Sequence, residues 1–274
     1  MKKIPEKLSD MDEVKELRIR ELSKMFSPHF SSLKNYQVFI MHLVIFLGAH
    51  KPVDDRDRTI RNLLADCNDM LDPIASSLKE GKYNVASTLT RRLYEDVSLA
   101  NAFMLNVELH NRWYSGEEIK NQEVREELNK SKLGADVEST RYLYGSLSDL
   151  SHPSRVAIMD RFLGEGVEFS LGGYTTPSVY HIAETLVQCL SLVFWLSATI
   201  AFFYKPLIHK HNPELIGLYK FTAEHAQKVN NQLHKELDRL LSEENITFIE
   251  KKYPQRKKNS KASLRNVAKV SRKL

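Results

Sequence analysis

Residues 185–204 read TLVQCLSLVFWLSATIAFFY, a run of twenty residues without a charged side chain. A run of this length is long enough to cross a bilayer. Gln188, Ser191 and Ser197 interrupt it, however, and a helix that is apolar on all sides is also typical of the centre of a large bundle. We therefore expect a buried core helix that begins after a Ser178 cap. A dimer interface would cover such a helix equally well.

Apolar residues at helical spacing lie on both sides of this run. Residues 55–81 carry a stripe with gaps of three and four, from Ile60 to Leu78, and Pro73 is expected to kink it. The chain has only ten Gly and nine Pro, which favours long helices over a turn-rich β fold. The sequence thus predicts an all-α, multi-helix bundle. The other helices are expected over residues 10–26, 31–48, 82–110, 136–151 and 214–243, with Pro28 ending the first and residues 206–213 forming a connector before the last.

One segment, residues 164–176, departs from this periodicity. Val167–Leu171 alternates between apolar and polar side chains and is flanked by glycines, which predicts a small irregular or hairpin insert. Ser115, followed three residues later by Glu118, predicts a capping box that opens a polar helix. We expect three parts: N-terminal helices over 1–50 that pack on the bundle, the main helical bundle over 51–243, and a basic flexible tail over 244–274.

Positive charge is concentrated at one end of the chain. The net charge is +5, yet residues 251–274 hold ten basic side chains and no acidic one, which leaves 30 basic and 35 acidic residues in the rest. Such asymmetry is typical of a segment that contacts nucleic acid, an anionic membrane or an acidic partner, and a solubilising terminus would look the same. The predicted phosphate-contacting residues are Lys251, Lys252, Arg256, Lys257, Lys258, Lys261, Arg265, Lys269, Arg272 and Lys273.

Cofactor and metal motifs are missing from the sequence. Cys67 and Cys189 are the only cysteines and belong to no CxxC pair, and His209 and His211 lack nearby carboxylates or thiols. We therefore predict no cofactor and no metal. The first residues are charged and hold no apolar segment of the secretory kind, so a cytoplasmic location is expected.

Two short polar motifs inside apolar helices form the candidate site. The first is Arg91-Arg92-Leu93-Tyr94-Glu95, in which Arg91 and Glu95 share a helical face, and Arg92 can pair with Glu95 or Asp96. The second runs from Tyr144 to Pro153. Its polar members recur at gaps of three and four and share one face with Arg141; they are Tyr144, Ser148 and His152. Because unpaired polar groups are costly to bury, the two motifs are expected to meet.

This set of side chains has two interpretations. As a pocket, the arginine fork would bind a phosphate or carboxylate, and His152 would hold or pass a proton. A helix C-terminus and a nearby Glu95 would both favour the imidazolium form, so we expect the pKa of His152 to be raised. As a structural network, Arg91 and Glu95 would form an interhelical or surface ion pair, and His152 would cap the end of its helix.

These motifs resemble those of a family of uncharacterised all-helical bacterial proteins. That family shows an Arg-Leu-x-x-Glu motif in one long helix, and later a Tyr-x-x-Leu-Ser-x-x-x-His motif; residues from about 50 to 205 are covered. The family is similar in turn to the HEPN superfamily of helical bundles, which often dimerise and include RNA-cleaving toxins and phage-defence effectors. In their usual ribonuclease motif four to six residues separate an arginine from the following histidine, whereas ten residues separate Arg141 from His152 here.

The resemblance implies a HEPN-like protein that binds or cleaves RNA, as a phage-defence or toxin-type effector. Metal-independent cleavage would need Arg91 or Arg92 to reach His152 from another helix, since the usual spacing is absent. The alternative is a non-catalytic interaction protein whose basic tail docks on a partner or an anionic membrane. We expect a homodimer because the apolar helices offer more surface than one bundle needs, and we rank a membrane-spanning protein last.

Overall fold

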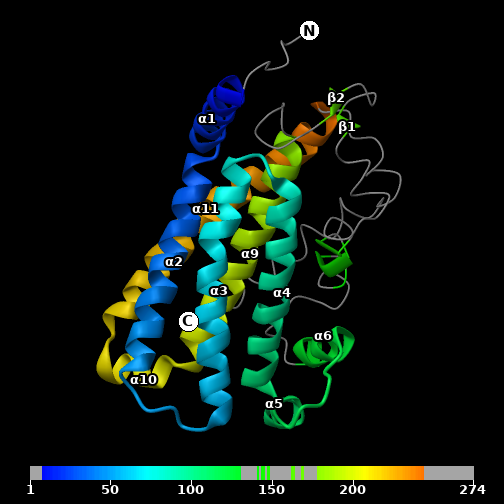
Figure 1. Ribbon diagram of the computed structural model, residues 1–274. Helices are drawn as coiled ribbons and strands as arrows, with labels where there is room; N and C mark the ends of the chain where they lie inside the picture. Colours follow the sequence, from blue (N-terminus) through cyan, green and yellow to red (C-terminus); the bar gives the residue numbers. More distant parts are fainter. Residues whose placement is uncertain are drawn as a thin grey trace.

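The computed structural model describes residues 8–130 and 178–243, together with 141, 143–145, 147–148, 162–163 and 168–169. The all-α, multi-helix prediction is confirmed, and long helices run side by side in Figure 1. The helices are α1 (Leu8–Met25), α2 (Ser27–Gly48), α3 (Asp55–Lys79), α4 (Tyr83–Leu105), α5 (Val107–Tyr114), α6 (Asn121–Lys130), α9 (Val179–Phe203), α10 (Lys205–His211) and α11 (Glu214–Glu243).

Helix α9 lies at the centre of the bundle. It packs against α2, α4 and α11, and α3 closes the remaining side by packing on α2 and α4 (Figure 1). Nearly every α9 side chain from Tyr180 to Ala201 is buried, including Phe194 and Trp195. The neighbouring helices of the same chain therefore cover the apolar run of residues 185–204.

Two helices are long and apolar enough to cross a membrane by length and composition alone. For α9, 83% of the most apolar window is buried inside the protein, as is typical of a core helix. For α2 the corresponding figure is 44%, and its exposed face carries Met41 and Ile45. Of these two helices, only α9 is predicted from the sequence as a run long enough to cross a membrane.

Side-chain caps fix where several helices begin. Asp54 accepts a hydrogen bond from the Asp57 N–H at 2.7 Å and caps α3, and Ser178 accepts one from the His181 N–H at 3.2 Å and caps α9, as predicted. Asn106 does the same for the Leu109 N–H at 3.0 Å. This cap ends α4 and starts α5, so the single helix expected over residues 82–110 is wrong: an N-cap interrupts it.

Three other expectations about helix boundaries are corrected. Pro28 lies in the first turn of α2 and Pro206 in the first turn of α10, where a missing N–H costs nothing, so neither ends a helix or marks a connector. Pro73 lies inside α3, which continues to Lys79, and the kink expected there stays a prediction. Ser115 follows the end of α5 and donates to the Arg112 carbonyl, so it opens no helix, and α6 begins only at Asn121.

A short antiparallel pairing joins the predicted insert to the two residues 162–163 that lie just before it. Strands β1 (Phe162–Leu163) and β2 (Glu168–Phe169) pair Phe162 with Phe169 and Leu163 with Glu168. The rest of the insert, and most of the helix expected over 136–151, lie outside the described residues; those described within 141–148 are helical. The basic tail over 244–274 also lies outside them.

A buried polar junction ties the ends of three helices together. Arg61 of α3 donates from Nη2 to Asp57 Oδ2 at 2.7 Å and from Nη1 to the carbonyls of Leu47 and His50, where α2 ends. The Tyr204 hydroxyl, at the end of α9, donates to Asp57 Oδ1. Burial opposes ionisation of Asp57, but these hydrogen bonds, with one from the Val53 N–H, hold its pKa below the usual value.

Candidate functional site

Arg91 and Tyr144 join the two sequence motifs. Arg91 Nη2 donates a hydrogen bond to the Tyr144 hydroxyl at 3.0 Å, and the guanidinium carbon lies 5.2 Å from the centre of the Tyr144 ring. Arg91 Nε also donates to Glu95 Oε1, one helical turn further along α4, at 3.3 Å. The helix that carries the first motif therefore contacts the second motif at this point.

Tyr144 is surrounded by cationic and aromatic groups from two helices. Asn121 Nδ2 of α6 donates to its hydroxyl at 3.2 Å, and the Arg125 guanidinium lies 5.4 Å from its ring centre. The Tyr94 ring of α4 lies 5.8 Å away. We call five residues the arginine–tyrosine cluster: Arg91, Tyr94, Asn121, Arg125 and Tyr144. Glu95 lies beside the cluster and is not counted in it.

Within the cluster, Arg125 lies beside the buried hydroxyl of Tyr94. Burial raises the pKa of Tyr94, while Ser98 and Arg125 beside the hydroxyl act in the opposite direction. The Nη1 atom of Arg125 is buried and has no hydrogen-bond acceptor among the described residues. An anionic group that binds at the cluster could therefore accept the hydrogen bond that Arg125 Nη1 does not make.

Arg92 lies apart from Tyr144 and pairs with a buried acid. Its Nε donates to Asp96 Oδ2 at 3.0 Å, which settles the choice between Glu95 and Asp96 that the spacing left open. The Arg92 side chain is 60% exposed, whereas that of Asp96 is 4% exposed. Burial raises the pKa of Asp96 to about 6; Arg92 opposes the shift, and the nearby carboxylates of Asp66 and Glu95 add to it.

The remaining predicted residues are only partly placed. Ser148 is helical and half-buried, three residues after Gly145 and four after Tyr144, on the same helical face as the tyrosine. His152 and the ten basic residues of the tail lie outside the described residues. The raised pKa of His152 and its meeting with Arg91 or Arg92 therefore stay predictions.

The contribution of α6 to the cluster is not predictable from residue spacing. Asn121 and Arg125 are four residues apart, so they share a helical face, but this pattern is common on polar surface helices and does not point to Tyr144. Tyr94 stands inside the first motif and was given no role. Its position next to Leu93, on the predicted buried side of the helix, is the only sequence signal for a role of Tyr94. The structure shows both side chains buried.

The thiols and the acidic groups offer little else for catalysis. Within the part of the chain that the structure describes, no group of three or more His, Cys, Asp or Glu side chains could hold a metal ion. Cys67 and Cys189 are free and buried, and burial raises the pKa of both thiols, that of Cys189 to about 12. A thiol with such a pKa is a poor nucleophile near neutral pH.

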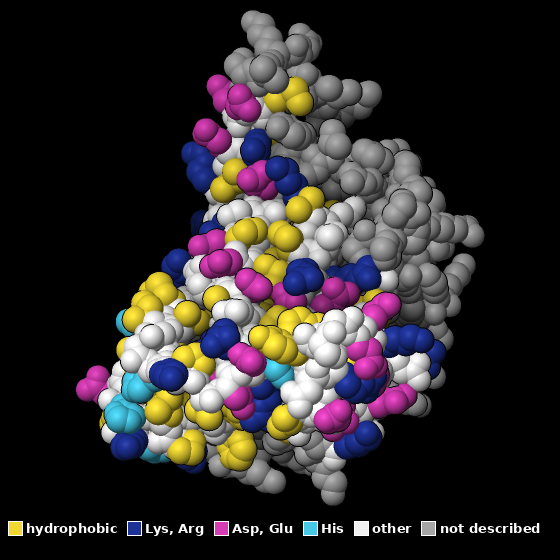
Figure 2. Space-filling view, turned by 60° about the horizontal axis from the view of Figure 1, so that its bottom comes forward, with side chains coloured by type: hydrophobic (Ala, Val, Ile, Leu, Met, Phe, Trp, Pro, Cys, Tyr) yellow, Lys and Arg dark blue, Asp and Glu magenta, His cyan; other side chains and the backbone are white. Residues whose placement is uncertain are grey.

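The arginine–tyrosine cluster can bind an anion and stack a planar group. The side chains of Arg91 and Glu95 are 20% and 28% exposed, so a ligand can reach them from solvent. On the face turned forward in Figure 2, basic and acidic side chains alternate and form no broad basic surface among the residues described. Recognition of an anion would therefore depend on local groupings such as this cluster. No family model, curated protein or solved structure matches this chain.

Proposed function

We propose that this chain is a HEPN-like RNA-binding protein in which the arginine–tyrosine cluster contacts the RNA. The observation that carries the proposal is the 3.0 Å hydrogen bond from Arg91 Nη2 to the Tyr144 hydroxyl, which joins the two motifs. Arginine suits phosphate because its planar fork offers several donors. Tyrosine and arginine side chains both provide flat surfaces on which unpaired bases stack, which is how single-stranded RNA is commonly held.

The basic tail would supply phosphate contacts that do not depend on sequence. Ten basic side chains lie between residues 251 and 274, against a body with more acidic than basic residues. Each phosphate that such a segment neutralises releases a counterion, so binding should weaken steeply as salt concentration rises. Tyr253 is the only aromatic residue between residues 251 and 274, so stacking is assigned to the cluster instead.

Cleavage of the bound RNA is the finer part of the proposal. In metal-independent cleavage, the ribose 2′-hydroxyl attacks the adjacent phosphorus, a base accepts its proton, and the bond to the 5′-oxygen breaks as an acid protonates that oxygen. We assign proton transfer to His152 and stabilisation of the phosphate charge to Arg91. Ser148 and His152 are four residues apart in the sequence, so the assignment expects a helix that continues to His152 and carries it on the same face as Tyr144 and Ser148.

An RNA degradation and binding assay without metal tests both parts. Labelled single-stranded RNA would be incubated with intact protein in EDTA, and binding would be followed by fluorescence anisotropy at two salt concentrations. Arg91→Ala should weaken binding about tenfold, because it removes a charged donor. His152→Ala should leave binding near that of the intact protein and reduce cleavage by about a hundredfold or more.

A matched control tests whether RNA binding depends on the cluster or on surface charge in general. Arg58 of α3 is 62% exposed and also pairs with an acid of its own helix, Asp55, but it lies outside the cluster. Arg58→Ala should therefore change neither binding nor cleavage. An equal loss for Arg58→Ala and Arg91→Ala would refute a specific role for the cluster.

The alternative function is a non-catalytic interaction protein whose tail docks on a partner or an anionic membrane. Deletion of residues 251–274 distinguishes it. If the deletion abolishes RNA binding while Arg91→Ala has no effect, the tail alone binds and the cluster is structural. If the intact protein does not bind RNA at either salt concentration, the RNA proposal fails and the interaction protein remains. An effector role predicts that expression of the intact chain, but not of His152→Ala, arrests growth.

A further inference from the structure

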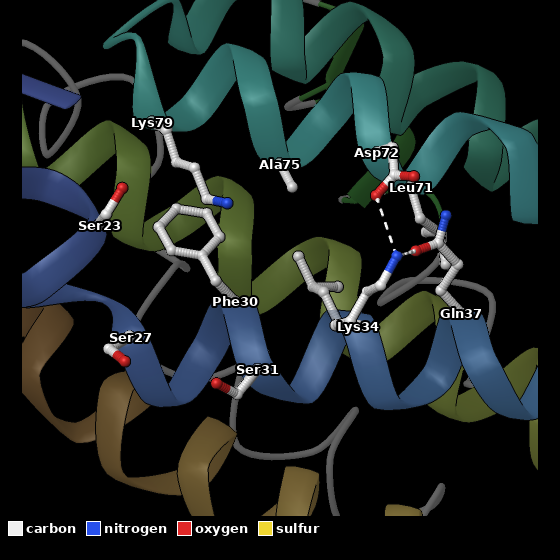
Figure 3. Close-up of a pocket in the computed structure, with 11 residues that line it drawn as sticks. Ser23, Ser27, Phe30, Ser31, Lys34, Gln37, Leu71, Asp72, Ala75 and Lys79 are labelled. Atoms are coloured by element: carbon white, nitrogen blue, oxygen red, sulfur yellow. Dashed lines mark hydrogen bonds and ion pairs between the residues drawn. The ribbon is translucent and has the colours of Figure 1, made fainter. Parts of the chain in front are cut away.

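A groove with polar walls lies between α2 and α3, on residues that the arginine–tyrosine cluster does not use. Figure 3 shows the α1–α2 side chains below and those of α3 above, with the opening between them. Its volume is about 300 Å³, at the lower end of the range for small-molecule sites. The floor is apolar, because Leu33 and Leu71 are each 2% exposed and Ala75 lies beside them.

One end of the groove carries excess positive charge. The Lys79 ammonium lies 5.0 Å from the centre of the Phe30 ring and has no carboxylate partner among the described residues. The adjacent acid, Glu80, is already engaged by Lys15 at 3.3 Å and by Lys82 at 2.6 Å. Because these two lysines engage Glu80, Lys79 remains available to an anion.

Three hydroxyl groups line the same groove. Ser23, Ser27 and Ser31 recur every four residues across the junction of α1 and α2, and none of their hydroxyls has a hydrogen-bond partner in the described ranges. An ammonium together with several hydroxyls offers separate donors to the oxygens of a phosphate. A phosphate monoester has three terminal oxygens that can accept these separate donors, whereas a carboxylate has only two. The chemistry therefore favours a phosphate over a carboxylate.

The other end of the groove carries groups that can bond to the edge of a base. The Lys34 ammonium donates to Gln37 Oε1 at 2.8 Å and lies 3.9 Å from Asp72 Oδ1. An amide and a carboxylate in one place can accept and donate along the hydrogen-bonding edge of a nucleobase. Asp72 and Lys79 are seven residues apart on α3, or about 10 Å along the helix axis, which matches the length of a mononucleotide from phosphate to base.

We propose that this groove binds a nucleoside 5′-monophosphate. Lys79 and the serine hydroxyls hold the phosphate, Leu33, Leu71 and Ala75 contact the sugar and the face of the base, and Gln37 and Asp72 bond to its edge. The site shares no residue with the arginine–tyrosine cluster, so this inference does not rest on the proposed RNA function.

Isothermal titration calorimetry of the intact chain tests the site. The probes are AMP, GMP, CMP and UMP, with adenosine and inorganic phosphate as partial ligands. At least one mononucleotide should bind more tightly than either partial ligand. Lys79→Ala should weaken that binding about tenfold or more, since it removes a charged donor. Ala75→Phe, which fills the floor of the groove, should abolish it.

Lys51 provides the matched control. It is an exposed lysine that follows the far end of α2, so Lys51→Ala should leave the affinity unchanged. Circular dichroism and thermal unfolding establish that each variant is folded before titration. The proposal is overturned if no mononucleotide binds more tightly than about 1 mM, if inorganic phosphate binds as tightly as the mononucleotides, or if folded Lys79→Ala and Ala75→Phe proteins keep the original affinity.

Discussion

Replacing Asp96 by asparagine should stabilise the protein at neutral pH. Asp96 lies on the buried face of α4 with 3% of its surface exposed, and Arg92 is the hydrogen-bond donor to its carboxylate. Because the Arg92 side chain is 60% exposed, water weakens this ion pair, and it does not offset the cost of burying the charge. Burial accordingly raises the pKa of Asp96 from 3.8 to about 6.

The sign and the size of the effect follow from proton linkage. Between pH 3.8 and about 6, the folded protein keeps a proton that the unfolded chain has lost, so the free energy of unfolding falls as pH rises through this window. At about 1.4 kcal/mol per pKa unit, the total loss is ~3 kcal/mol, complete above the folded pKa. Asp96→Asn removes the titration. It should therefore gain up to about 3 kcal/mol at pH 7.5 and only about 1 kcal/mol at pH 4.5.

Urea unfolding followed by circular dichroism measures both values. Asp66→Asn is the control, because Asp66 is exposed and is itself one of the charges that raise the pKa of Asp96. It should change the stability far less than Asp96→Asn at either pH. An Asp96→Asn protein that is less stable than the intact chain at pH 7.5, or whose stability difference is the same at both pH values, would refute the reasoning.

Three further changes test the fold and the cluster. Tyr204→Phe removes the hydroxyl that donates to Asp57 and should lower the free energy of unfolding by about 1 to 3 kcal/mol in urea titration, because a buried carboxylate loses a donor. Asn106→Ala removes the cap between α4 and α5 and should cost about 1 kcal/mol, measured in the same way. Tyr144→Phe removes the acceptor for Arg91 and Asn121 but keeps the ring; RNA anisotropy should show a smaller loss than for Tyr144→Ala.

The core was predictable where burial alone decides the structure. The uncharged run of residues 185–204 is apolar on all sides, and only the centre of the bundle satisfies such a helix without another partner. The stripe from Ile60 to Leu78 faces α2 and α4 for the same reason. Hydrophobic periodicity reports which face is buried, and it reports this well for long helices.

Helix ends were predicted less well because they depend on backbone hydrogen bonds. The apolar pattern continues from Phe103 through Val107, so the periodicity does not register the cap that Asn106 provides between them. The sequence predicts that Pro28 ends a helix, although proline suits the first turn of a helix equally well. In both places the apolar pattern allows more than one position for the helix end. The cap of Asn106 and the missing N–H of Pro28 decide between them.

The sequence predicts the contacts between site residues of the same helix, but not the contacts between residues of different helices. Spacing correctly paired Arg91 with Glu95 and allowed Arg92 to pair with Asp96, since both are contacts over one turn. Asn121 and Arg125 reach Tyr144 only because α6 packs on α4. No local pattern encodes that packing, so their roles could not be derived from the sequence.

Two buried aspartates differ in how well their surroundings stabilise the charged carboxylate. Asp57 receives hydrogen bonds from Arg61, Tyr204 and the Val53 N–H, and its pKa is lowered; its charge is stabilised where three helix ends meet. Asp96 has the exposed Arg92 as its donor, and its pKa is raised, so its charge destabilises the fold at neutral pH. A costly charge next to a candidate site is what function, and not folding, would retain. If Asp96 orients Arg92 as an additional RNA contact beside the arginine–tyrosine cluster, Asp96→Asn should be more stable and bind RNA less tightly. Stabilisation without weaker binding would show that Arg92 takes no part in RNA binding.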